Sequence, residues 1–261
     1  MSRKIIVVTL VLGVIAGFLV YNSDAMKEAR FIKALVARNV EARGGAEVWQ
    51  GVSSLRLAGE MDLGQGLAVP YVLEQKRPGK MCFEFVFDGD TSTQCADGEQ
   101  GWKVVPFRGP GAPEPMTEAE LRETVDSADP YGPLYDYSAR GHDVTLVGEE
   151  SLGGRNAFKL KVTLPSGGVR WLYLDAESAL EVKLESMRKV GGRDRRVETL
   201  YSDWQEADGL LIARRQDTTT EGDTESHFLT VTKVNVNPPI DDLRFAMPVA
   251  AVDAPAQNEM Q

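Results

Sequence analysis

Residues 158–164 read FKLKVTL, a stretch in which every second side chain is apolar. Residues 180–185 (LEVKLE) and 228–236 (FLTVTKVNV) have a similar period of two. Strict alternation is typical of antiparallel strands that have one buried face and one solvated face. Turn signals such as Asp88-Gly89 and Asp208-Gly209 separate runs of this kind. The sequence therefore predicts a mainly β fold with about ten strands and few helices.

The composition of the 261-residue chain is that of a folded protein, with 43% hydrophobic and 26% charged residues. Its formal net charge of -10 repels phosphate backbones, so we expect no nucleic-acid partner. With two His and two Cys, one chain cannot build a three-histidine or four-cysteine metal site. The nucleophile-elbow, zinc-protease and phosphate-loop motifs are also missing. We therefore expect a protein that is not an enzyme and that has no catalytic residue, metal or cofactor.

The first residues resemble an export signal. Arg3-Lys4 precedes an apolar run over 5–21, and small residues within 23–25 suit cleavage by a signal peptidase. The same run is close to the shortest length that can cross a bilayer as a helix. We therefore expect a periplasmic protein with one of two N-termini. The first, which we prefer, is a cleaved signal peptide over 1–25, and the second is an uncleaved inner-membrane anchor over 5–21.

Two segments have helical signals. Apolar side chains recur at helical spacing over 27–40, and Gly44-Gly45 ends that helix. Thr117 and Glu120 form a capping box, which predicts a helix through about Val125. A further helical turn is expected through Tyr137.

The remaining segments define the architecture. The proline-rich residues 106–115 can form neither a helix nor a central strand. Two modest helices must then cover the dry face of a large sheet. This predicts a curled antiparallel sheet, or unclosed half-barrel, with a helical lid and room for a cavity. We expect one domain over 26–247 and a disordered tail over 248–261.

The two cysteines fall opposite each other if Asp88-Gly89 is a two-residue hairpin turn. Cys82 and Cys95 would then form a non-hydrogen-bonded pair, whose short Cα separation suits a disulfide. Export would place this pair in an oxidising compartment. We expect the disulfide Cys82–Cys95, and the alternative is two free buried thiols.

Aromatic residues share a face on two of the predicted strands. Phe83, Phe85 and Phe87 lie opposite the cysteines, and Trp171 and Tyr173 alternate with leucines. Such rows are either ordinary core or the wall of a cavity that accommodates lipid. The sequence pattern alone favours core, unless the helices are too small to cover the sheet.

Several short motifs occur in an order that resembles the LolA family of periplasmic lipoprotein carriers and outer-membrane lipoprotein-sorting proteins. The central ones are Arg77-Pro78, Asp97-Gly98, Trp102 and Pro106-Phe107, within the closest part of the resemblance at 46–107. Weaker similarities are ARGG at 42–45, WLYLD at 171–175, ADGL at 207–210 and DLRFAMP at 242–248.

This resemblance implies an unclosed β-barrel whose helical lid closes over a hydrophobic cavity for acyl chains. The expected wall residues are Phe83, Phe85, Phe87, Trp171 and Tyr173. Leu121 and Val125 are expected on the lid. Arg77 matches the arginine before proline that hydrogen-bonds the lid and helps to gate the cavity in such carriers. The alternative for Arg77 is a charged strand end on the surface.

We therefore expect a periplasmic carrier or binding protein that holds lipids or lipoprotein acyl chains non-covalently during outer-membrane lipoprotein sorting. Its partners would include an inner-membrane transporter or an outer-membrane acceptor. The alternative is a membrane-anchored sensor or regulatory binding module on the same fold. A processed N-terminus favours the carrier, and an intact anchor over 5–21 favours the sensor.

Overall fold

The computed structural model describes residues 24–64, 66–108, 111–190 and 192–248. The predicted anchor, and all but the last residues of the predicted signal peptide, therefore lie outside the described residues, as does most of the predicted tail. Within these ranges, no helix is both long and apolar enough to cross a membrane. The chain divides into two compact units, unit 1 (Met1–Ala46 and Leu134–Glu198) and unit 2 (Glu47–Pro133 and Thr199–Gln261). The single domain expected over 26–247 stays a prediction.

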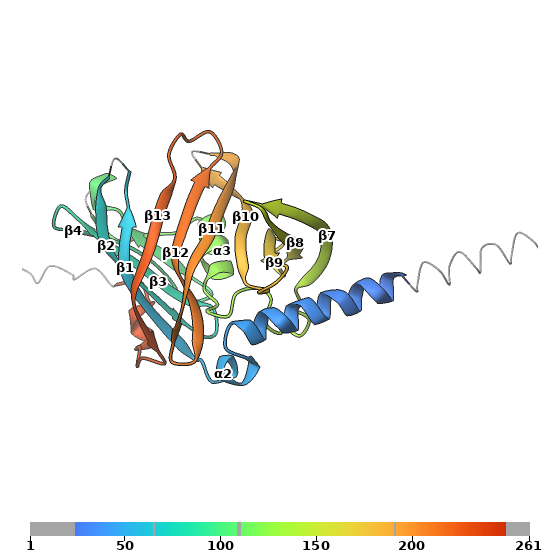
Figure 1. The fold of residues 1–261 in the computed structure, drawn as a ribbon. Helices are drawn as coiled ribbons and strands as arrows, with labels where there is room; N and C mark the ends of the chain where they lie inside the picture. Colours follow the sequence, from blue (N-terminus) through green and yellow to red (C-terminus); the bar gives the residue numbers. More distant parts are fainter. Residues whose placement is uncertain (1–23, 65, 109–110, 191, 249–261) are drawn as a thin grey trace, which may run out of the picture. The chain divides into compact units, whose positions relative to one another are not determined.

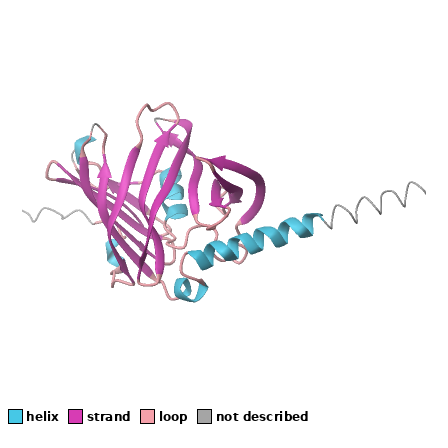
Figure 2. Cartoon of the chain, viewed as in Figure 1, coloured by secondary structure: helices cyan, strands magenta, loops and turns pink. Residues whose placement is uncertain are grey.

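The described residues form a mainly β structure, with strands in magenta throughout Figure 2. The strands are β1 (Ser54–Asp62), β2 (Ala68–Lys76), β3 (Lys80–Phe87), β4 (Asp90–Ala96), β5 (Gly101–Val104), β6 (Glu114–Pro115), β7 (Asp143–Leu152), β8 (Arg155–Thr163), β9 (Val169–Asp175), β10 (Glu181–Val190), β11 (Arg193–Ala207), β12 (Leu210–Thr220) and β13 (His227–Val236). The helical elements are the N-terminal helix over 24–42, α2 (Ala46–Gln50), α3 (Glu118–Ser127) and the 3-10 turns η1 (Pro106–Arg108) and η2 (Asp242–Arg244).

The strand order is β6-β5-β4-β3-β2-β1-β13-β12-β11-β10-β9-β8-β7. Because β6 and β7 lie at opposite ends of this order, the sheet is unclosed, which confirms the predicted fold class. The estimate of about ten strands was too low. Strands such as β5 and β6 are only four and two residues long, too short for alternation to reveal them. At the other edge, the β7–β8 register shifts between Leu146 and Gly148.

Unit 1 packs the N-terminal helix against one face of its strands (Figure 1). Ile32, Leu35 and Val36 recur at helical spacing and are buried against the leucines of β8 and β9. The Asn39 side chain donates a hydrogen bond of 2.9 Å to the Ala179 carbonyl, within the same unit. The helix ends where predicted, because the chain continues into Gly44-Gly45, both at positive φ.

Unit 2 contains a meander of consecutive antiparallel strands, β1 to β5, with β13 paired to β1 and β12 to β13. Helix α3 packs against β3 and β4 (Figure 1). Its N-cap is Thr117, and the predicted capping box with Glu120 is formed. Helix α3 runs to Ser127, two residues past the expected end.

The β3–β4 hairpin has the predicted register. Asp88 and Gly89 have φ values of 52° and 85°, as the favoured two-residue hairpin turn requires at both positions. Cys82 consequently pairs with Cys95 and forms the predicted disulfide. Both cysteines are 0% exposed.

Residues 240–248, which we call the C-terminal clasp, cover the disulfide. The buried side chains of this cluster are Cys82, Cys95, Trp102, Ile240 and Phe245. The Arg244 guanidinium bridges Glu74 at 2.7 Å and Glu84 at 2.6 Å. Asp242 forms ion pairs with Lys76 of β2 and Lys80 of β3. The clasp therefore seals the disulfide face of unit 2 with both apolar and ionic contacts.

One local expectation is wrong. The helical turn predicted through Tyr137 is a series of turns, in which the His142 amide bonds the Tyr137 carbonyl at 2.8 Å. Glycine and proline at 132–133 interrupt the backbone geometry that a helix needs. The expectation for 106–115 is confirmed for its described residues, which form the three-residue 3-10 turn η1 and the edge strand β6, and neither an α-helix nor a central strand. Pro115 is tolerated there because an edge strand can lack one donor.

The disulfide should stabilise unit 2 by closing a loop of about 14 residues, worth roughly 3 kcal/mol in the chain-entropy model. We expect neither Cys82 nor Cys95 to react with an alkylating agent unless the exported, unfolded protein is first reduced. The double variant Cys82→Ser/Cys95→Ser should unfold at lower denaturant concentration by that free energy. Quantitative alkylation of both cysteines without reductant would contradict the assignment.

Candidate functional site

Five aromatic rings form a continuous row on one side of unit 2, which we call the aromatic face. In the order of their contacts, its members are Tyr71, Phe83, Phe85, Phe107 and Phe87. Successive ring centroids lie 5.5, 6.3, 5.9 and 6.1 Å apart, within the range of favourable aromatic contacts. The phenylalanines of β3 are half-buried, and Phe107 is 48% exposed. The row is thus only partly covered by the rest of the described chain.

Helix α3 lies on the aromatic face, as the register establishes. Gly101 pairs with Ala96, which pairs with Met81, and Met81 alternates with Phe83 on the same side of β3. A Cβ on Gly101 would lie 3.1 Å from Leu121 Cδ1 and 2.6 Å from Met116 Sδ. A larger residue at 101 would therefore displace the Met116 and Leu121 side chains, which pack directly on this glycine. The second expected lid residue, Val125, lies over Gly79.

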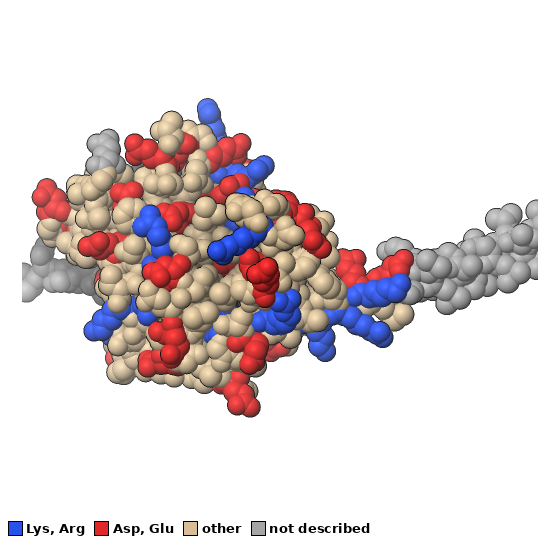
Figure 3. Space-filling model, viewed as in Figure 1, with Lys and Arg blue, Asp and Glu red and all other residues tan. Residues whose placement is uncertain are grey.

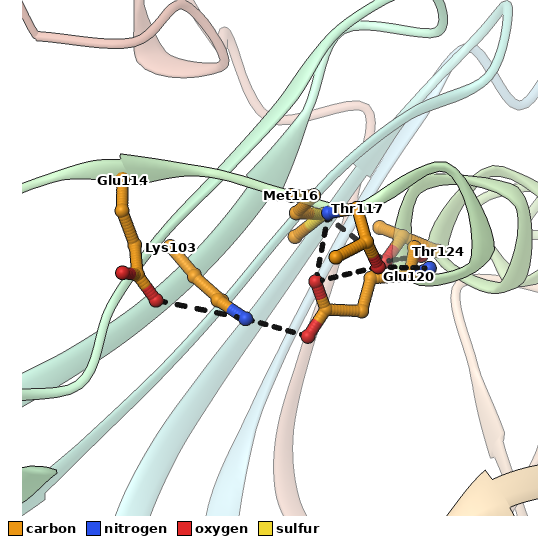
Figure 4. Close-up of polar contacts among 6 residues, drawn as sticks. All are labelled: Lys103, Glu114, Met116, Thr117, Glu120 and Thr124. Atoms are coloured by element: carbon orange, nitrogen blue, oxygen red, sulfur yellow. Dashed lines mark hydrogen bonds and ion pairs between the residues drawn. The ribbon is translucent and has the colours of Figure 1, made fainter. Parts of the chain in front are cut away.

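An ion pair holds the N-terminal end of α3 to the sheet (Figure 4). Lys103 Nζ lies 2.5 Å from Glu120 Oε1 and 3.6 Å from Glu114 Oε1. The other carboxylate oxygen of Glu120 accepts from the Thr117 amide at 2.8 Å. The hydrogen bond to Glu120 raises the pKa of Lys103. Burial favours a higher pKa for Glu120, but hydrogen bonds from Lys103 and Thr117 outweigh it and lower that pKa.

The other end of α3 is held through β2. The Gln75 amide donates to the Ser127 carbonyl at 2.9 Å. Arg77 stacks its guanidinium 4.1 Å from the centroid of the Tyr131 ring and donates to the Tyr131 hydroxyl. Tyr131 in turn donates to the Val52 carbonyl at 2.9 Å. Arg77 thus contacts the segment after α3 through the side chain of Tyr131.

The other two expected wall residues, Trp171 and Tyr173, belong to unit 1. Tyr173 is 0% exposed, and its hydroxyl donates to Glu185 at 2.8 Å. Lys159 and Lys183 lie 4.8 and 5.0 Å from the centroid of its ring. Burial is the main reason why the pKa of Tyr173 is raised. The hydrogen bond to Glu185 also raises this pKa, and the hydrogen bond with Lys159 acts in the opposite direction. The surroundings of Tyr173 are therefore charged as well as aromatic, and its role as a wall residue stays a prediction.

Two shallow hollows occur on the described surface of unit 2, and none of the expected wall residues lines either. One is lined by Trp102 and residues 243–248 of the clasp, apart from Phe245. The other is lined by Ser53, Ser54, Lys76 and residues 237–241. In the parts of the chain described, no group of three or more His, Cys, Asp or Glu could hold a metal ion. Across the face shown in Figure 3, acidic and basic side chains are interspersed.

Sequence reasoning missed several residues of this site. Tyr71, Lys103, Gln75 and Tyr131 carry no motif of their own. Tyr71 could have been found from the hairpin between β2 and β3, since pairing places it opposite Phe85. Phe107 was quoted only as part of a family motif, and its contact with the phenylalanine row depends on the fold.

Glu120→Gln tests the ion pair, because glutamine retains the capping box and removes the charge. At neutral pH the amides of α3 should exchange with solvent up to about five-fold faster than in the wild type, the range of an exposed ion pair. The pKa of Glu120 is lowered in the folded protein. The slower amide exchange of the wild type should therefore be fully present above the ordinary pKa of glutamate, and it should be lost as the pH falls through the lowered pKa of Glu120. Glu118→Gln, on the same turn, is the control.

No protein-family model matches the sequence, and no curated protein matches it. Solved structures do match. A DUF1329 family protein from Desulfovibrio piger has a TM-score of 0.57 at 13% identity, over 82% of this chain and 97% of that one. A LolA superfamily protein from Nitrosomonas europaea has a TM-score of 0.56 at 13% identity, over 82% and 96%.

A third match is the structure of a putative outer membrane lipoprotein-sorting protein domain from Vibrio parahaemolyticus. Its TM-score is 0.52 at 13% identity, over 84% of this chain and 94% of that one. Each of the three matches covers more than four fifths of this chain and more than nine tenths of the matched chain. The chain therefore has the fold of the LolA superfamily and of outer-membrane lipoprotein-sorting proteins.

Proposed function

We propose that this protein is a periplasmic carrier or binding protein that holds lipids or lipoprotein acyl chains non-covalently on the aromatic face of unit 2. The main support for this proposal is the row of five aromatic rings. The row is only partly covered, and it lies on the face of the sheet against which α3 packs. The fold of lipoprotein-sorting proteins supports the same role. Each methylene group that moves from water onto such a surface contributes about 0.8 kcal/mol.

Binding on this face requires α3 to move. Helix α3 packs on the same face as the aromatic row, against β3 and β4. Two attachments keep the helix in place, the Lys103–Glu120 ion pair at its start and the Gln75 and Arg77 contacts at its end. An acyl chain would replace the Leu121 and Val125 contacts with its own. Release would follow when α3 closes again or when an acceptor offers a better site.

The expected cellular role follows from this exchange. The protein would be exported to the periplasm, receive its ligand from an inner-membrane donor and deliver it to an outer-membrane acceptor. No covalent step is needed, because displacement by α3 is sufficient for release. For Trp171 and Tyr173 to contribute rings on unit 1, Tyr173 must first be uncovered, because it is 0% exposed in the structure.

Phe85→Ala tests the binding face. The ring of Phe85 touches both Phe83 and Phe107, so its removal interrupts the row at its centre. We expect fluorescent fatty-acyl probes to bind the variant about ten-fold more weakly, since a lost ring contributes roughly 1.5 kcal/mol or more. Phe228→Ala is the matched control, because register places half-buried Phe228 on the opposite face, beside Arg215. Equal losses in the two variants, or no lipid by native mass spectrometry and no probe binding in the wild type, would contradict the proposal.

Arg77→Leu tests the gate. Arg77 contacts only the closed arrangement in this proposal, and a charged hydrogen bond contributes about 1.5–3 kcal/mol. Because Arg77 is exposed, we take the lower value, which predicts lipid release about ten-fold slower from the variant. Arg122→Leu, an exposed arginine on α3 itself, is the control and should leave the dissociation rate unchanged. Equal rates for wild type and Arg77→Leu would remove the gating role without removing the binding face.

A further inference from the structure

Arg214 of β12 is a half-buried cation whose charge no carboxylate of the described chain balances. Its Nε atom is buried and bonds no group among the described residues. The next residue, Arg215, shows the usual alternative, because its guanidinium donates to both carboxylate oxygens of Asp217, at 2.9 and 2.7 Å. A buried N–H without an acceptor is unfavourable, and more so when the group is charged. The Nε atom of Arg214 is therefore available to an anionic partner from outside the described chain.

The strand register places Arg214 on the same side of the sheet as the aromatic face. Strand β12 is continuous over Leu210–Thr220, so Arg214 shares the side of Gln216, two residues later. From β12 to β2, the directly paired residues on this side are Gln216, Leu229, Met61 and Val69. Tyr71 lies two residues after Val69 and has the same orientation. Arg214 and the first ring of the aromatic face are thus on one side of unit 2.

Lys103 is a second cation on this side, but its charge is already balanced. Strand pairing through β4 places Lys103 on the side of Phe83. Its ammonium lies 2.5 Å from the Glu120 carboxylate and 3.6 Å from that of Glu114. An incoming anion would have to displace these carboxylates at Lys103, whereas at Arg214 it meets an unbonded donor.

The path from Arg214 to the rings is apolar. The inward-facing residues of β13, β1 and β2 along it are Leu229, Val231, Gly59, Met61 and Val69. Three strand spacings separate β12 from β2, a distance of about 14 Å. An extended twelve-carbon chain has a similar length. Val231 and Val69 are buried, so the hydrocarbon reaches them only after the rearrangement that the proposed function requires.

The geometry of a guanidinium suits a carboxylate or a phosphate. Nε and one of the Nη atoms donate in parallel to two oxygen atoms of such a group. Because Arg214 is only half-buried, a head group bound to it lies where this side of the sheet meets solvent. A hydrocarbon attached to that head group then extends over the apolar path. A ligand with a neutral head would leave the charge of Arg214 unbalanced.

We propose that Arg214 binds the anionic head group, a carboxylate or a phosphate, of a ligand whose hydrocarbon chain extends from β12 toward the aromatic rings of β2 and β3. This inference rests on the proposed function and narrows its ligands to anionic amphiphiles. Arg214 is thus a specificity-determining residue. It selects the head group and sets where the hydrocarbon chain begins, and the aromatic face binds the chain itself.

Three ligands with the same twelve-carbon chain and different head groups test the proposal: laurate, dodecyl phosphate and dodecanol. Displacement of a neutral fluorescent acyl probe from the full chain reports the affinity of each. The wild type should bind both anions about ten-fold more tightly than dodecanol, the lower range for a charged hydrogen bond. This ratio should fall to about one in Arg214→Gln. Arg214→Lys, which keeps the charge and loses the parallel donors, should have an intermediate ratio.

Arg215→Gln is the matched control, because it removes the same charge from the next residue, on the opposite face beside Phe228. It should keep the wild-type ratio. If Arg214→Gln keeps that ratio, or if Arg215→Gln loses it equally, the head-group contact is wrong and the proposed function stands. If the wild type binds no acyl probe, the proposed function fails and this inference with it.

Two further measurements separate a lipid head group from other roles of Arg214. Inorganic phosphate, which is the head without the chain, should not displace the probe at concentrations at which dodecyl phosphate does. Equal displacement by both would indicate a site for free anions and overturn the inference. Without ligand, Arg214→Gln should melt at no lower temperature than the wild type, because Nε has no bond to lose. A clearly lower melting temperature would assign Arg214 a structural role instead.

Discussion

The alternation of side chains along β3 is the constraint on which both faces of unit 2 depend. Successive side chains of a strand point to opposite faces, so Cys82 faces the clasp while Phe83 faces α3. A slip of one residue between β3 and β4 would exchange the two sets. The disulfide to Cys95 excludes that slip. A covalent bond on one face therefore fixes the register of the aromatic row on the other.

Features that depend on neighbouring residues could be predicted from the sequence. Asp88-Gly89 specifies a two-residue turn through its positive φ angles, and the pairing of the cysteines follows by counting outward. The capping box of Thr117 and Glu120 is equally local, which is why the start of α3 was placed correctly. The order of strands across the sheet was less accessible, because short strands such as β6 carry no periodic signal.

Contacts between distant segments could not be predicted. Arg77 and Tyr131 are 54 positions apart, and the sequence indicates only that an arginine precedes a proline. The charged surroundings of Tyr173 illustrate a second limit. Alternation places Tyr173 on one face of β9, but Lys159 and Lys183 reach it only because β8 and β10 flank that strand. Which strands are neighbours decides whether an aromatic side chain meets lipid-like or charged surroundings.

The two edges of the open sheet have a consequence for association between molecules. An unpaired strand edge is a template on which a second chain can add by backbone hydrogen bonds. Here one edge strand is β6, which is only two residues long and ends in Pro115. The other is β7, whose pairing register shifts before Gly148 and which contains the exposed residues Glu149 and Glu150. Neither edge offers a long run of regular, uncharged backbone. Addition of a second chain by backbone pairing is therefore disfavoured at both ends of the described strand order, although the sheet is open.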